Sequence, residues 1–429
     1  MPAPPCRAVR TPDRRRRRPG ALAGISMFLS FLLSLRRASL NRRASLASAC
    51  PTRQPEGRAM TWRILAAAFL VLAAAPAAWL AQLPAPVHPA APPVPAAEQA
   101  GLIEALRPPK RTRPLIAIVA INDATEVTDY LVPAGILRRA GVADVMLLAT
   151  GPGPVRLYPA LRVRPDATIA DFDRARPQGP DYVIVPAMSR EDPQLLDWLR
   201  RQADSGATVV AVCAGARVAA AAGLLDGKRA VTHWYYLPGM LKRHPDIRHV
   251  PDRRMVADRG VATTTGITAS IPMMLTLTEA IAGRGKAEAV ARELGLASWD
   301  ASHASAGFRL THPFATTVLA NRAQFWRREE LALPLRPGMD EVTLALSADA
   351  WSRTYRSAVV GVAAAPVVTA NGIAILPDRA SGGEGAGQVP AFADRPPAAA
   401  LDLTLEAIGR RYGPRTADVV AMQLEYPGE

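Results

Sequence analysis

Apolar runs of strand length that alternate with segments of helical spacing constrain the fold of this 429-residue chain most. The runs are "PLIAIVAI" (114–121), "ADVMLLAT" (143–150), "DYVIVPA" (181–187), "TVVAVC" (208–213) and "GVATTTG" (260–266). Continuous apolar strands are typical of parallel sheets that are covered by helices on both faces. The alternation therefore predicts a doubly wound α/β domain with a mainly parallel sheet.

The positive charge of the chain is concentrated in its first 60 residues. These residues contain thirteen arginines and only two acidic residues, Asp13 and Glu56, and so carry +11 of the net charge of +15. The remaining chain is nearly balanced, which argues against a nucleic-acid partner for the folded part. We expect residues 1–59 to be a disordered basic leader.

The apolar stretch "MTWRILAAAFLVLAAAPAAWLAQ" (60–82) has the length and flanks of a secretory signal peptide or a single transmembrane anchor. A buried Ala/Leu helix is the alternative. A signal belongs at the N-terminus, so Met60 as well as Met1 is a candidate start. Residues 83–112 follow as a Pro-rich linker. The expected location is the cell envelope, either anchored in the inner membrane or periplasmic.

The C-terminal part of the chain resembles a faded copy of the first domain. "EVTLALSADAWSRTYRSAVVGVAAAPVVTANGIAILPD" again predicts helix, strand and hairpin, and "LDLTLEAIGRRYGPRTADVVAMQLEY" parallels "MMLTLTEAIAGRGKAEAVARELGL". The copy lacks the stretch that would carry a cysteine. We therefore expect an α/β domain over 113–312 and a degenerate half-domain over 313–429.

Cys213 is the only cysteine outside the leader, which holds Cys6 and Cys50. It ends an apolar strand and is followed by Ala214 and Gly215, which allow a sharp turn into a helix, as in a nucleophile elbow. N–H groups at the start of that helix would favour the thiolate and lower the cysteine pKa. The alternative is a buried cysteine that acts as a small hydrophobic residue.

The segment "AVCAGARVAAAAGLLDGKRAVTHW" resembles the corresponding segment of the ThiJ/PfpI family, in the class I glutamine-amidotransferase-like superfamily. The resemblance covers roughly 113–310, and its nearest branches are isocyanide hydratase and the sensor half of AraC-type regulators. It implies a flavodoxin-like, glutamine-amidotransferase-like fold for this domain. It implies that Cys213 is the nucleophile and that Asp129, four residues before Pro133, is a carboxylate directed at the sulfur. It also implies that His233, in "THW", lies near the thiol. Family members usually dimerise, so the resemblance implies a homodimer.

Each of these residues has a structural alternative, and other residues complete the expected pocket. Asp129 could cap a helix, with Glu126 as the second candidate carboxylate, and His233 could be a satisfied histidine at a strand end. The pocket is expected to include Ala214, Gly215 and Trp234. The family usually has a Gly pair after the "VIVP" strand, whereas this chain has Ala187, whose N–H is the candidate oxyanion donor.

Other kinds of site find little support in the sequence. Neither a Walker loop nor a GxGxxG motif occurs, so no cofactor is expected. His303 and His312 lack the spacing and companion ligands of a metal site. "KAEAVARELGLASWDAS" (286–302) has only the first half of a helix-turn-helix.

Three functions remain open from the sequence. The first is a cysteine-dependent hydratase or hydrolase acting on a small electrophile, with Asp129 as proton carrier. The second is a non-catalytic ligand-sensing or interaction module, and the third is a thiol redox sensor.

Overall fold

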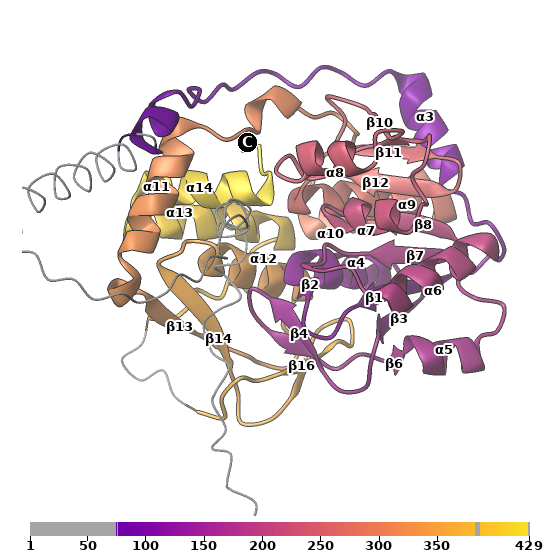
Figure 1. Ribbon diagram of the computed structural model, residues 1–429. Helices are drawn as coiled ribbons and strands as arrows, with labels where there is room; N and C mark the ends of the chain where they lie inside the picture. The colour runs from indigo at the N-terminus through magenta and orange to yellow at the C-terminus, as the bar shows by residue number, and fades with distance from the viewer. Residues whose placement is uncertain (1–73, 75, 382–386, 428–429) are drawn as a thin grey trace, which may run out of the picture. The chain divides into compact units, whose positions relative to one another are not determined.

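The computed structural model describes residues 74, 76–381 and 387–427 (Figure 1). The predicted leader and most of the predicted apolar segment lie outside these residues. Within the described ranges, no helix has both the length and the apolar character to cross a membrane. The described residues all belong to one compact unit.

A seven-stranded sheet in the order β11-β12-β8-β7-β1-β3-β6 organises the first part of this unit. Its strands are β1 (Leu115–Ala120), β3 (Asp144–Ala149), β6 (Ala167–Thr168), β7 (Tyr182–Val185), β8 (Thr208–Ala211), β11 (Met255–Asp258) and β12 (Val261–Thr264). All neighbours pair in parallel except β11 and β12. The predicted doubly wound fold with a mainly parallel sheet is confirmed.

Helices cover both faces of this sheet because the strand side chains alternate between two apolar cores. In β1, Ile116 and Ile118 join the core under α4, α9 and α10, whereas Ala117 and Val119 join the core under α5, α6 and α7. The helices are α3 (Ala96–Ala105), α4 (Val127–Ala140), α5 (Ile169–Ala175), α6 (Pro193–Asp204), α7 (Gly215–Ala221), α8 (Leu237–Arg243), α9 (Ser270–Ala282) and α10 (Arg284–Leu294). Asp192 caps α6 through the Leu195 N–H, and Pro193 is the first residue of the helix.

The elements from β13 onward follow the same order as β1, α4, β3, β4 (Val155–Tyr158), β5 (Arg162–Val163), α9 and α10 of the first part, without the elements between β5 and α9. This part of the chain contains α11 (His312–Ala323), β13 (Glu329–Pro334), α12 (Glu341–Ser352), β14 (Ser357–Val362), β15 (Val367–Val368), β16 (Ala374–Leu376), α13 (Ala400–Tyr412) and α14 (Pro414–Leu424). β13 and β14 pair in parallel, as β1 and β3 do. α12 packs on both α4 and α13, in the way that α4 packs on α9.

A second sheet connects the two parts of the chain. Its order is β15-β16-β5-β4-β2, with β2 (Thr125–Glu126), β4 (Val155–Tyr158) and β5 (Arg162–Val163). β16 pairs antiparallel with β5, placing Ile375 opposite Val163. The short strands β9 (Arg229–Ala230) and β10 (Arg248–His249) form a separate pair. The segment predicted as a linker contains α3, whose Leu102 is buried.

Candidate functional site

The backbone at Cys213 has the strained geometry of an elbow. Cys213 follows β8 with a φ of +55°, a region that non-glycine residues rarely occupy and that costs on the order of 1–3 kcal/mol. Two buried hydroxyls hold it there. Thr264 Oγ1 accepts the Cys213 N–H at 2.9 Å, and Thr232 Oγ1 donates to the Cys213 carbonyl at 3.0 Å.

Gly215 allows α7 to begin directly against the end of β7. A Cβ atom at this position would lie 2.0 Å from the Val185 carbonyl oxygen and 2.9 Å from that of Pro186. No side chain can be accommodated at such distances without movement of the main chain. The glycine two residues after the cysteine is therefore required by the turn itself.

Asp129 lies buried in the first turn of α4, next to the thiol. Glu126 is the N-cap of this helix and accepts the Asp129 N–H at 2.7 Å. The Ala187 N–H donates to Asp129 Oδ2 at 3.0 Å. Burial raises the pKa of Asp129 to about 7, although the Ala187 hydrogen bond and the neighbouring Cys213 thiol oppose the rise. Ala187 would thus have to release Asp129 before it could serve as an oxyanion donor.

The thiol of Cys213 is protonated at neutral pH. Burial raises its pKa well above the ordinary value, and the nearby carboxylates of Asp129, Glu126 and Glu425 raise it further. The Ala214 N–H opposes this rise. The lowered thiol pKa expected from the sequence is therefore wrong for this closed site, because burial, together with three carboxylates, outweighs the effect of the short helix α7.

His233 is directed at the C-terminal segment of the chain. The Tyr235 N–H donates to His233 Nδ1 at 3.2 Å, so the ring proton lies on Nε2, which contacts the Gln423 carbonyl oxygen at 3.1 Å. Burial lowers the pKa of His233 and keeps the ring neutral. Trp234 faces the same segment through its indole N–H, 2.8 Å from the Met422 carbonyl oxygen. Both ring nitrogens of His233 are thus engaged away from the sulfur.

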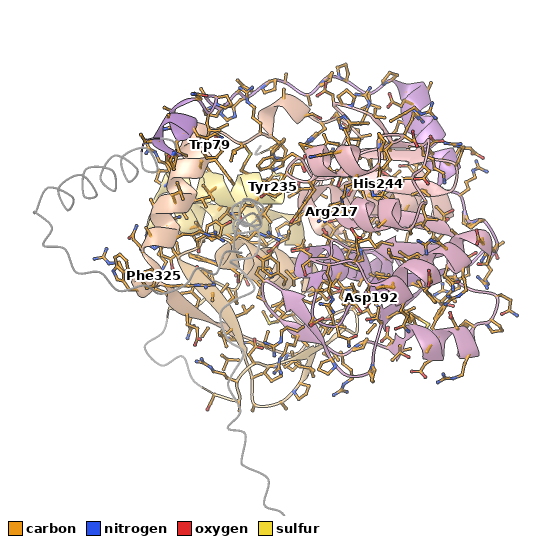
Figure 2. All side chains as sticks on the ribbon, in the orientation of Figure 1. Trp79, Asp192, Arg217, Tyr235, His244 and Phe325 are labelled. Carbon is orange, nitrogen blue, oxygen red and sulfur yellow. The ribbon has the colours of Figure 1, made fainter. Side chains whose placement is uncertain are left out.

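Glu425 follows α14 and inserts into the site. Its side chain is buried between the Trp234 N–H, 3.2 Å from Oε2, and His303 Nε2, 3.0 Å from Oε1. Gly266 makes room for it, because a Cβ atom there would lie 2.1 Å from the Glu425 Cβ. Figure 2 shows Arg217 near Tyr235. The Arg217 guanidinium lies 4.7 Å from the centre of the ring of the next residue, Tyr236.

The second part of the chain also supplies a buried cation beneath the site. Arg353 Nη2 lies 2.9 Å from Glu126 Oε1, and Arg353 Nε lies 2.6 Å from Asp349 Oδ1. The Thr128 hydroxyl donates to the other Asp349 oxygen at 3.0 Å. The helix cap that positions Asp129 is therefore held by residues more than two hundred positions away, which no local sequence pattern indicates.

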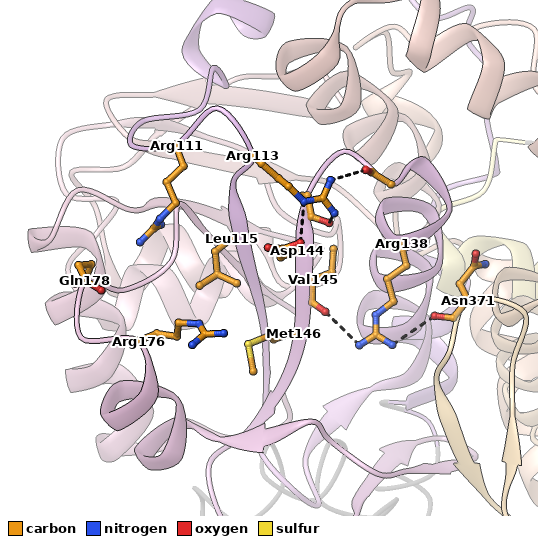
Figure 3. Close-up of a pocket in the computed structure, with 12 residues that line it drawn as sticks. Arg111, Arg113, Leu115, Arg138, Asp144, Val145, Met146, Arg176, Gln178 and Asn371 are labelled. Atoms are coloured by element: carbon orange, nitrogen blue, oxygen red, sulfur yellow. Dashed lines mark hydrogen bonds and ion pairs between the residues drawn. The ribbon is translucent and has the colours of Figure 1, made fainter.

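A cavity of about 620 Å³ lies at the opposite edge of the main sheet (Figure 3). Leu115 and Asp144 line it, and they are the first residues of β1 and β3, whereas Cys213 follows the carboxyl end of β8. The Arg113 guanidinium is paired with Asp144, and Arg138 binds the Val145 carbonyl oxygen. The cavity is therefore separate from the site of the thiol. Among the described residues, no cluster of His, Cys, Asp or Glu side chains could hold a metal ion.

Comparison with known proteins identifies the family of the domain that contains Cys213. Residues 116–280 match the model of the DJ-1/PfpI family, so the chain contains a DJ-1/PfpI family domain.

Particular relatives include two bacterial proteins and one solved structure. The chain is 36% identical over 147 residues to isonitrile hydratase of Pseudomonas putida, covering 33% of this chain and 60% of the relative. It is 29% identical over 135 residues to the HTH-type transcriptional regulator CdhR of Pseudomonas aeruginosa, covering 30% of this chain and 38% of the relative. The match thus spans less than two thirds of either relative. The crystal structure of Drosophila melanogaster DJ-1beta is matched over 43% of this chain and all of that chain, with 24% identity and a TM-score of 0.40.

Proposed function

We propose that this protein is a cysteine-dependent catalyst that adds water to a small, uncharged electrophile, with isonitriles as the substrate class. The observation that carries the proposal is the pairing of Cys213 at its elbow with Asp129, whose pKa is raised to about 7. A carboxyl group with this pKa can take up and return a proton at neutral pH. The protonated thiol therefore has a proton acceptor beside it.

The chemistry needs only these two side chains and water. The Asp129 carboxylate takes the thiol proton as the Cys213 sulfur bonds to the isonitrile carbon, and then delivers that proton to the same carbon, which gives a thioimidate. Water adds across the carbon–nitrogen double bond, its hydroxyl to carbon and its proton to nitrogen. Cleavage of the carbon–sulfur bond, with transfer of the hydroxyl proton to sulfur, releases an N-substituted formamide and restores the thiol.

The surroundings of the thiol favour a small, neutral substrate. The side chains of Glu126, Asp129 and Glu425 would repel an anion, and Cys213 is only 3% exposed. The similarity to isonitrile hydratase of Pseudomonas putida supports an isonitrile in particular.

The second candidate function is ligand sensing without turnover. It is supported by the closed site, in which Gln423 and Glu425 bind the His233–Trp234 segment, and by the similarity to a transcriptional regulator. A thiol redox sensor is less favoured, because the thiolate is the species that is oxidised and the raised pKa of Cys213 keeps it scarce.

We also propose that the protein is exported or anchored in the inner membrane through residues 60–82. The support is the apolar stretch itself, which contains a single charged residue, Arg63. Alkaline extraction of membranes from expressing cells tests it. An anchored chain stays in the pellet, a cleaved chain is released with a new N-terminus, and an intact chain in the cytosolic fraction contradicts the proposal.

The catalytic proposal is tested with the full-length protein and an alkyl isonitrile, following formamide formation by proton NMR. Formamide should form with turnover, more slowly as the pH falls below about 7, where Asp129 becomes protonated. Cys213→Ser and Asp129→Asn should each abolish it, whereas the exposed-carboxylate control Asp197→Asn should not. Saturable isonitrile binding without formamide would support sensing, and unchanged activity in Cys213→Ser would refute the catalytic proposal.

A further inference from the structure

Exposed aromatic and basic side chains gather on α11 and the 3-10 turn that follows it, η4 (Phe325–Arg327). Phe325 is 75% exposed, Trp326 is 68% exposed and Leu319 is 45% exposed. We call this surface, together with Arg327 and Arg328, the α11 patch. Large apolar side chains concentrated on one exposed segment indicate an interaction site.

The charge of this segment is of one sign. Residues 309–328 contain four arginines and neither aspartate nor glutamate. The next two residues are acidic, but Glu329 is paired with Arg411 and Glu330 with Arg379. The α11 patch therefore presents a positive field around its aromatic side chains, which complements an anionic surface.

The first described residues run beside α11 and add apolar surface to it. The His312 N–H donates to the Pro84 carbonyl oxygen at 3.1 Å, and Arg309 donates to the Ala85 carbonyl oxygen at 3.0 Å. Trp79 is 47% exposed, and residues 64–97 contain no charged side chain other than His88, if it is protonated. Figure 2 shows Trp79 and Phe325 on the same flank of the protein, beside α11.

We propose that the α11 patch docks onto an anionic phospholipid bilayer. Tryptophan and phenylalanine beside arginine match the boundary between headgroups and acyl chains, and arginines near the surface are attracted by anionic lipids. The predicted apolar segment 60–82 ends at Trp79–Gln82, on the side of α11, so a chain held there would present the α11 patch to the same bilayer. The inference rests on the proposed membrane location and is independent of the catalytic proposal.

The test uses the full-length protein with Cys6→Ser and Cys50→Ser, labelled at Ala323→Cys with a nitrobenzoxadiazole fluorophore. The matched control carries the label at Asp197→Cys on α6, at the other side of Figure 1. Vesicles of phosphatidylcholine, with or without phosphatidylglycerol, contain doxyl-labelled lipid as quencher. We expect quenching at position 323 and none at 197, and stronger quenching with phosphatidylglycerol.

Substitutions in the α11 patch should weaken docking. Arg327→Gln with Arg328→Gln should lower the ratio of docked to undocked protein roughly 30-fold. Each arginine near an anionic surface contributes about 1 kcal/mol, and about 1.4 kcal/mol corresponds to a tenfold change in the ratio. Phe325→Ser with Trp326→Ser should abolish quenching, whereas Val368→Ser, an exposed residue on β15, should not change it.

Co-sedimentation with the vesicles separates this proposal from that of the anchor. Sedimentation through residues 60–82 without quenching at position 323 would overturn docking while leaving the anchor intact. A concentration-dependent change in label emission without lipid would instead assign the α11 patch to a second copy of the chain, and would also overturn the proposal.

Discussion

Replacing Arg353 tests whether the second part of the chain holds the first part in its active arrangement. Its guanidinium lies between Glu126 and Asp349 at 2.9 and 2.6 Å, and its side chain is only 11% exposed. Arg353→Met keeps most of the apolar stem but leaves two buried carboxylates without their cation. Breaking a buried ion pair by removal of one partner costs about 3–5 kcal/mol. We expect a loss of that size in the free energy of unfolding.

Urea denaturation followed by circular dichroism measures this loss. The control is Arg201→Gln, whose side chain is 59% exposed and lies 3.6 Å from Asp173, and for which less than about 1 kcal/mol is expected. Adding Glu126→Gln and Asp349→Asn to Arg353→Met should restore much of the stability, because no unpaired charge then stays buried. A loss in Arg353→Met no larger than in the control would refute the reasoning.

Three further predictions concern the site itself. Gly215→Ala should destabilise the protein by about 1–3 kcal/mol or more, since its Cβ would lie 2.0 Å from a main-chain oxygen, and an unchanged denaturation midpoint would contradict this. The pKa of Asp129 is about 7 in the folded protein and about 3.8 in the unfolded chain. The free energy of unfolding should therefore fall by roughly 4 kcal/mol as the pH rises between these two values, because the unfolded chain releases this proton first. Asp129→Asn should flatten that decline in pH-dependent unfolding curves, and an unaltered slope would argue against the raised pKa. Gly266→Ala should displace Glu425 and speed iodoacetamide alkylation of Cys213, which mass spectrometry measures; an unchanged rate would show that Glu425 does not restrict access.

Much of the fold could be predicted from the sequence because its signals are local. Uninterrupted apolar strands indicate a parallel sheet even when the order of the strands in the sheet is unknown. The cap at Asp192 depends on a hydrogen bond to a residue only three positions away. The turn at Cys213 was likewise indicated by the small residues that follow it. These features depend on neighbours in sequence, so a pattern is sufficient to find them.

The electrostatics of the site could not be predicted because they arise from distant segments. Glu425 approaches Cys213 from the far end of the chain, and Arg353 reaches Glu126 across 227 positions. Burial beside several carboxylates reverses the direction of the thiol pKa that the helix alone would give. Thr264, which holds the elbow, resembles any threonine at the end of a strand.

The two helices α4 and α12 show how the second part of the chain packs against the first. They begin with "EVTDYL" (126–131) and "EVTLAL" (341–346), so Leu344 stands where Asp129 stands in the first helix. The glutamate at the start of each helix is nevertheless buried against the other part. Glu126 lies against Arg353, the residue after α12, and Glu341 lies against α4. A Cβ atom at Gly135 would lie 2.5 Å from the Glu341 Cγ. The reciprocal contact is that of a two-fold interface within one chain.

This reciprocity bears on the homodimer that the resemblance implies. In the second part Leu344 stands where Asp129 stands in the first, and α12 packs on α4. A dimer of this protein would have to form through another face, because α12 already covers this one. Light scattering of Arg353→Met distinguishes the two arrangements. If α12 is displaced and a second copy takes its place, the variant should dimerise, whereas a dimer that uses another face should be unaffected by the substitution.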